Sequence, residues 1–166
     1  MSGVAISITV DDRHVRKQFD SLARLMDNTT PVMAAIGTGL VEGTHQRFIT
    51  QTDPDGAAWV PLNRDYAEGK RNSRILTESG RLRDSITDHA SAREVHVGTN
   101  VIYAAIQQLG GTIVPKNSTH LYFRMGGRLI KADKVTLPAR PFLGISRDDE
   151  TMISETVFEF LERYTR

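Results

Sequence analysis

The chain has 166 residues, of which 39% are hydrophobic and 25% charged, a balance typical of one globular domain. Its 21 basic and 20 acidic residues give a net charge of +1, so total charge does not indicate a nucleic-acid-binding protein. The lack of cysteine excludes thiol catalysis, disulfide bonds and cysteine-based zinc sites. Because no segment reads as a membrane span or a signal peptide, we expect a single domain over residues 1–166 that binds no membrane.

The N-terminal half of the sequence predicts a strand followed by two helices. Apolar residues alternate over residues 4–10, which is typical of a half-buried strand. The next helix follows Asp12 and places four apolar residues on one face: Val15, Phe19, Leu22 and Met26. A second helix, with Thr30 as N-cap and Pro31 in its first turn, runs to about residue 50. Three glycines at positions 37, 39 and 43 weaken it, so we expect either the first helix or a neighbouring subunit to approach closely there.

The C-terminal half predicts short elements and one long helix. Residues 51–76 form an irregular connection, residues 77–86 a short helix, residues 94–97 a strand, and residues 103–109 either a helix or a strand. Residues 121–131 predict a hairpin, because the Gly126-Gly127 turn supplies the positive φ angles that tight hairpins need. Ser146 caps a last helix whose apolar face is Met152, Ile153, Val157, Phe160, Leu161 and Tyr164. The fold class is α+β, with an antiparallel sheet packed against two N-terminal helices and a C-terminal helix, plus a protruding β-hairpin arm over residues 112–137.

Partial matches to catalytic and metal-binding motifs each lack a required residue. The Asp53-Pro54-Asp55-Gly56 segment is similar to a calcium loop, but Leu62 stands where a bidentate Glu is required. Gly144-Ile145-Ser146 resembles a nucleophile elbow, but Asp148 replaces its last glycine. The five histidines are scattered. We therefore expect no catalytic residue, no metal, no cofactor and no enzymatic activity.

Two proline-stiffened segments predict structural anchors. Trp59 with Pro61, and Phe142 in the second segment, should be buried to fix the paths of chain that forms no regular ladder. Arg140 lies between Pro138 and Pro141, so its guanidinium is held in place at low entropic cost. We expect it to pair with a carboxylate of its own or a neighbouring chain.

Local charge is uneven although the total is balanced. Residues 116–140 carry six basic residues and one acidic residue, whereas residues 147–166 carry three basic and six acidic residues. This favours contacts between copies, with two solvated faces of a monomer as the alternative. The arm's predicted interaction residues are Leu121, Phe123, Met125, Arg124 and Arg128. Its apolar side could instead fold back on its own core, or Tyr122 and Phe123 could stack on nucleic acid.

Four segments together carry a family resemblance. They are Phe48 with DPDGAAWVPL (53–62), ILTESGRLRDSI (75–86), VGTN with Tyr103-Ala104, Gln108 and Gly110-Gly111 (97–111), and LPARPFLGIS (137–146). In this order and spacing the chain resembles the phage virion morphogenesis family, the tail completion proteins of Mu-like and P2-like phages and prophages. One departure is Gln107, where a His is expected.

The resemblance implies a structural virion protein, assembled in the host bacterial cytoplasm, that acts when tails are completed and joined to DNA-filled heads. It implies a homo-oligomeric ring, commonly of six copies, acting as tail terminator or neck at the head-proximal end of the tail. The implied partners are other phage tail and neck proteins, with a passing contact to phage DNA. The alternatives are a DNA-contacting neck protein and a transient assembly factor that is not retained in the virion.

Overall fold

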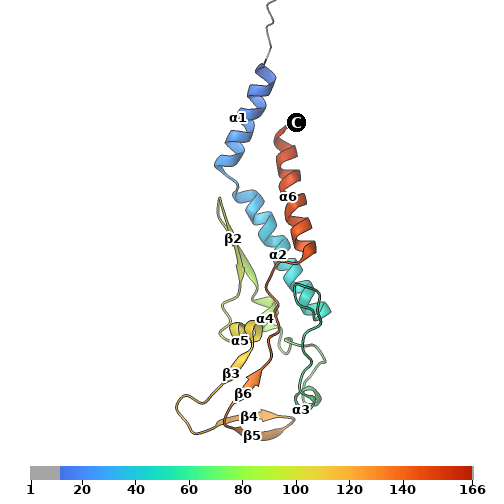
Figure 1. Ribbon diagram of the computed structural model, residues 1–166, viewed down its shortest axis with the longest axis vertical. Helices are drawn as coiled ribbons and strands as arrows, with labels where there is room; N and C mark the ends of the chain where they lie inside the picture. The colour runs from blue at the N-terminus through green and yellow to red at the C-terminus, as the bar shows by residue number, and fades with distance from the viewer. Residues whose placement is uncertain (1–11, 166) are drawn as a thin grey trace, which may run out of the picture.

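The computed structural model describes residues 12–165, and the strand expected over residues 4–10 lies outside them. The described chain is elongated (Figure 1). Its upper part is helical and contains α1 (Arg13–Asp27), α2 (Thr30–Thr50) and α6 (Arg147–Thr165). Its lower part contains the short helices α3 (Arg64–Glu68) and α5 (Ala104–Leu109), while α4 (Arg81–Asp84) lies between the two parts. The α+β class predicted from the sequence is confirmed.

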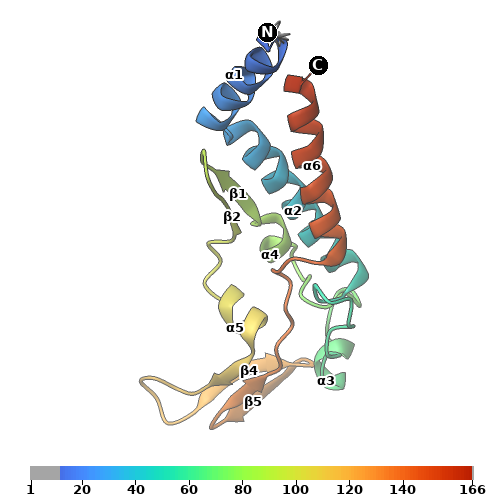
Figure 2. The ribbon, with the colours of Figure 1, turned by 45° about the horizontal axis from the view of Figure 1, so that its top comes forward.

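The strands form three separate antiparallel pairs, where we expected one sheet. β1 (Thr87–Ala90) pairs with β2 (Val95–Gly98), and β3 (Gly111–Ile113) pairs with β6 (Val135–Leu137). β4 (Leu121–Met125) pairs with β5 (Arg128–Ala132) in the predicted hairpin. Since a two-stranded ladder is marginal in water, each pair needs a packing surface. The β1–β2 pair finds it along α2, beside which it runs in Figure 2.

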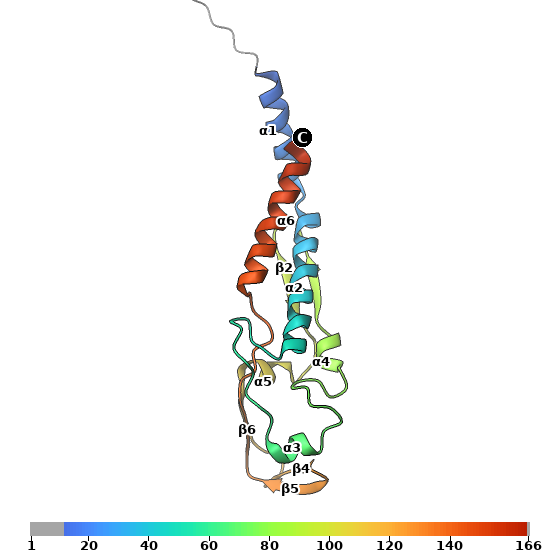
Figure 3. The ribbon, with the colours of Figure 1, turned by 90° about the vertical axis from the view of Figure 1, so that its right-hand side faces the viewer.

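The glycines of α2 make room for α6 and for the β1–β2 pair. A Cβ at Gly39 would meet the Met152 side chain, and one at Gly43 would meet the Asp149 carboxylate, both from α6. A Cβ at Gly37 would meet side chains of β1 and β2. Figure 3 shows α6 running alongside α2. The expectation that α1 or a neighbouring subunit fills this space was therefore wrong, because the C-terminal helix returns to pack there.

The ends of the long helices differ in how closely they match the prediction. α2 begins at Thr30, so its N-cap is Thr29 instead of the predicted Thr30, and Pro31 lies in the first turn. Ser146 caps α6 as predicted: its Oγ accepts a hydrogen bond from the Asp149 backbone N–H at 3.1 Å, and its own N–H donates to Asp149 Oδ2 at 2.8 Å. This reciprocal pair of bonds fixes where α6 begins.

The hydrophobic core lies where the lower end of α2 meets the loops. Its buried members are Phe48, Trp59, Leu82, Ile86, Val101, Ala104 and Phe142. The centroid of the Phe48 ring is 5.5 Å from that of the Trp59 ring, in an edge-to-face arrangement, and 5.4 Å from that of the Phe142 ring. The apolar face of α1 is not part of this core, because Val15, Phe19 and Met26 are exposed. Over residues 12–165, no helix combines the length and the apolar character that a membrane span requires.

Candidate assembly site

Two segments far apart in the sequence are bound together beside this core. The Trp59 Nε1–H donates to the Pro141 carbonyl at 2.7 Å. In the opposite direction, the Arg140 guanidinium donates through Nε to the Val60 carbonyl at 2.7 Å and through Nη2 to the Pro61 carbonyl at 3.0 Å. We refer to Arg47, Trp59, Gln108, Arg140, Phe142 and Asp149, with the bonds they make, as the junction.

Arg140 binds backbone carbonyls of its own chain, where the sequence predicted a carboxylate of its own or a neighbouring chain. The side chain is buried, with 5% of the residue exposed, and it donates hydrogen bonds to two backbone carbonyls of its own chain. Extended segments rich in proline leave carbonyls without ladder partners, and the planar guanidinium fork satisfies two of them at once. Burial lowers the pKa of this guanidinium from its ordinary value.

Gln108 is a junction residue whose role the sequence did not reveal. Its side-chain Oε1 accepts hydrogen bonds from the backbone N–H groups of Phe142 (2.9 Å) and Leu143 (3.0 Å), while its Nε2 donates to the Leu143 carbonyl at 2.7 Å. The carbonyl of Gln107 accepts from the Arg140 N–H at 2.8 Å. The end of α5 thereby holds residues 140–143 through hydrogen bonds of the kind that a neighbouring strand would make. Gln107, where the family resemblance leads us to expect a His, contributes through its backbone carbonyl.

A buried ion pair completes the junction. The Arg47 guanidinium of α2 contacts the Asp149 carboxylate of α6, and each side chain is only 6% exposed. Arg47 Nη1 also donates to the Phe142 carbonyl at 3.2 Å and to Thr44 Oγ1 at 3.3 Å. The two residues are 102 positions apart, and the sequence analysis did not predict their pairing. The pair ties the last helix to the same point as the two extended segments.

The segments that carry the family resemblance meet in this junction and the adjoining core. Phe48 and Trp59 come from the first segment, Leu82 and Ile86 from the second, Val101 and Ala104 from the third, and Phe142 from the fourth. The predicted anchors Trp59 and Phe142 are 4% and 0% exposed, whereas Pro61 is exposed and contributes its carbonyl. In this chain, the residues that carry the resemblance therefore serve packing and backbone bonding.

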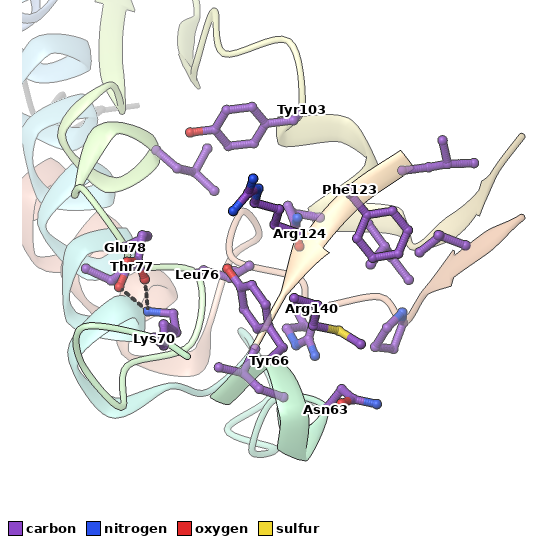
Figure 4. A pocket seen from close by; sticks show the side chains of 18 of the residues that line it. Asn63, Tyr66, Lys70, Leu76, Thr77, Glu78, Tyr103, Phe123, Arg124 and Arg140 are labelled. Atoms are coloured by element: carbon purple, nitrogen blue, oxygen red, sulfur yellow. Dashed lines mark hydrogen bonds and ion pairs between the residues drawn. The ribbon is translucent and has the colours of Figure 1, made fainter. Parts of the chain in front are cut away.

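Below the junction lies a pocket of about 910 Å³, shown in Figure 4. One wall comes from the chain between residues 61 and 82, and the other from β4 and residues 135–140. The Lys70 side chain is 2% exposed, and its ammonium binds Glu78 Oε2 at 2.9 Å and the Thr77 carbonyl at 2.6 Å. The hydrogen bond from Lys70 is the main cause that lowers the pKa of the Glu78 carboxyl.

The hairpin borders this pocket and has two unlike faces. Gly126 and Gly127 have φ angles of 56° and 77°, the left-handed values predicted for the turn. Leu121, Phe123 and Met125 are half-buried and line the pocket. The turn lies against α3, because a Cβ at Gly126 would come within 3.1 Å of the Asp65 carbonyl. In the isolated chain the tip of the hairpin thus rests on its own lower end.

A second face of the hairpin carries four exposed side chains, two of which, Tyr122 and Arg124, also line part of the pocket. Tyr122 stands opposite Lys131, and Arg124 stands opposite Leu129. Tyr122 is 61% and Leu129 is 68% exposed, and both cations are exposed as well. We refer to these four residues as the hairpin's exposed face. The predicted interaction residue Arg128 is exposed at the first position of β5, outside this group.

Metal-binding clusters are absent from the described part of the chain. Residues 12–165 contain no group of three or more His, Asp or Glu side chains arranged to hold a metal ion. The site consists of the junction, a pocket beneath it, and a hairpin with a basic and aromatic exposed face.

Comparison with known proteins identifies the family and several relatives of this chain. The sequence matches the phage virion morphogenesis family over residues 10–162. It is 30% identical over 160 residues to the putative capsid assembly protein G of Escherichia phage Mu, covering 92% of this chain and 91% of that protein. It is 29% identical over 150 residues to the Mu-like prophage FluMu G protein 2 of Haemophilus influenzae, covering 90% and 91%.

A third relative is the tail completion protein S of Escherichia phage P2, which is 24% identical over 150 residues and covers 87% of this chain and 95% of that protein. No solved structure matches the chain significantly. The family match and these relatives indicate a structural protein of phage assembly. The chain belongs to the phage virion morphogenesis family.

Proposed function

We propose that this chain completes the phage tail at its head-proximal end and makes it competent to join a head, as a non-enzymatic structural protein. The observation that carries the proposal is the family match over residues 10–162, together with a relative named as a tail completion protein that aligns over 87% of this chain. The junction supports it, because the residues that carry the family resemblance form packing and backbone bonds there.

The protein acts as a homo-oligomeric ring in this proposal. Large apolar side chains are exposed at the upper end of the molecule, among them Phe19 of α1 at 66% and Phe158 of α6 at 68%. At the lower end, Tyr122 and Leu129 are similarly exposed. Exposed apolar groups at both ends of an elongated chain, with opposite charge on the hairpin and on α6, suit repeated contacts between copies and with other tail and neck proteins.

An in vitro completion assay tests the function. Tails are prepared from cells infected with a phage that lacks this chain, and purified protein is added before heads. We expect infectious particles to increase only when the protein is added before the heads, and we expect it to stay in the particles. Restored infectivity without retained protein would identify a transient factor. A protein that is needed only when DNA is packaged would contradict the proposal.

A further inference from the structure

The outer side of α6 is complementary to the hairpin's exposed face. It carries an apolar ring beside acidic groups, whereas the hairpin carries apolar groups beside cations. Phe158 is 68% exposed and lies three residues after Glu155 and directly before Glu159, both of which are exposed. Residues three or four apart share a helical face, so Glu155, Phe158 and Glu159 form one surface. Phe158 is on the side of the helix away from Met152 and Thr156, which are half-buried. This surface presents a large apolar ring beside carboxylates.

The hairpin's exposed face offers the complementary groups. Its cross-strand register puts Tyr122 and Leu129 on one diagonal and Arg124 and Lys131 on the other. Cross-strand neighbours lie about 5 Å apart, so the four side chains make one compact patch. A phenyl ring could cover the apolar diagonal while two carboxylates meet the two cations.

We propose that the hairpin's exposed face binds the outer surface of α6 from an adjacent copy, with Phe158 between Tyr122 and Leu129, and with Glu155 and Glu159 paired to Arg124 and Lys131. This inference rests on the proposed ring and names the surfaces that build it.

The contact forms between copies and not within one chain. Figures 1 and 2 place α6 in the upper part of the molecule and the hairpin at its lower end. Contact between opposite ends is head-to-tail, the type of interface that closes into a ring when the rotation between copies permits.

Charge selects α6 over the other exposed apolar helix. α1 also exposes apolar side chains, but residues Arg13–Asp27 contain four basic and two acidic residues. α6 contains six acidic and two basic residues. A basic hairpin is repelled by the first and attracted by the second, so electrostatic complementarity fixes both the partner and the register.

Charge exchange provides the first test, read out as self-association by sedimentation over a concentration series. We expect Arg124→Glu and Glu159→Arg each to weaken association at least about tenfold, and the double variant to regain most of the loss. Phe158→Ala should weaken it about 30-fold, as for a central aromatic anchor. The matched controls are Arg93→Glu and Glu42→Arg, exposed charges on the β1–β2 turn and on α2, which should have no effect. Single variants that both weaken association without mutual rescue would overturn the proposal.

Cross-linking provides the second test, and it is clean because the chain has no cysteine. Ser154→Cys lies one helical turn before Phe158, and Asp133→Cys lies two residues beyond Lys131. When the two single variants are mixed, a short bismaleimide should yield dimers containing one of each, both in solution and on completed tails. The pair Glu42→Cys with Arg93→Cys should not cross-link. Equal yields from the two pairs, or no cross-linked dimer in either setting, would overturn the proposal.

DNA is the competing occupant of the same face. If Arg124→Glu weakened binding to duplex DNA while Glu159→Arg left self-association unchanged, the hairpin would be a DNA contact and the inference would be wrong. Cysteine variants that complete tails without forming this cross-link would overturn the inference and leave the proposed function standing. Wild-type protein that fails to complete tails would overturn the proposed function itself.

Discussion

Replacing Trp59 tests whether the junction carries the stability of the fold. The residue is 4% exposed, packs edge-on against Phe48, and donates its indole N–H to the Pro141 carbonyl. Burying about 200 Å² of aromatic side chain at about 25 cal/mol per Å² contributes about 5 kcal/mol. We therefore expect Trp59→Ala to lower the free energy of unfolding by about 3–5 kcal/mol, within the range measured for large-to-small core changes.

A second variant separates the hydrogen bond from the packing. Trp59→Phe keeps most of the aromatic contact but leaves the Pro141 carbonyl without its donor, which should cost about 1–3 kcal/mol. Urea unfolding followed by far-UV circular dichroism is the suitable assay, because both variants remove the chain's only tryptophan. Phe19→Ala, on the exposed face of α1, is the control and should change stability by less than about 0.5 kcal/mol. A Trp59→Ala protein within about 1 kcal/mol of wild type would refute the reasoning.

Three further predictions concern α2, α6 and the pocket. Gly43→Ala should destabilise the protein although alanine favours helix by about 1 kcal/mol, because its Cβ would meet the fixed Asp149 carboxylate; Gly39→Ala, which meets only a flexible methionine, should unfold closer to the wild-type urea midpoint. Asp149→Ala should cost about 3–5 kcal/mol in urea unfolding by leaving Arg47 buried and unpaired, and a loss below about 1 kcal/mol would contradict the ion pair's role. The pKa of Glu78 is lowered in the folded state, so its stabilising contribution is present above the usual glutamate range and is lost as the pH falls through the lowered value; unfolding measured against pH should show this acid-side loss in wild type and not in Glu78→Gln.

Periodicity predicted the long elements well because it reports on faces that must be buried. α2, α6 and the β4–β5 hairpin were found within a few residues of their expected bounds. The hairpin was specified locally by two glycines at its turn, and α6 by the Ser146 cap. Signals of this kind need no knowledge of the rest of the fold.

Two short elements, β1 and α3, were missed because tertiary contacts create them. β1 has the sequence Thr-Asp-His-Ala, which has no strand pattern, and it forms because it pairs with β2 and packs on α2. α3 spans five residues and is capped by Asn63, whose side chain accepts from the Asp65 N–H at 2.9 Å. Nothing in the local sequence distinguishes such segments from a loop.

In the junction, too, the partners of single residues depend on tertiary contacts that the local sequence does not indicate. The prolines around Arg140 correctly indicated a stiff segment, but its partners are carbonyls 79 and 80 positions away. The sequence did not predict the role of Gln108, because a glutamine is usually an exposed polar residue. Its role is recognised only when the segment that it binds has been placed beside it. Hydrogen bonds that replace a missing strand can be recognised only once both segments are placed.

The most direct test of the central claim is cryo-electron microscopy of tails made with and without this chain. We predict a ring of density at the head-proximal end of the tail that disappears when the chain is omitted and returns when purified protein is added. Tails whose head-proximal ends look the same in both preparations, or added protein that binds only at the opposite end, would contradict the account.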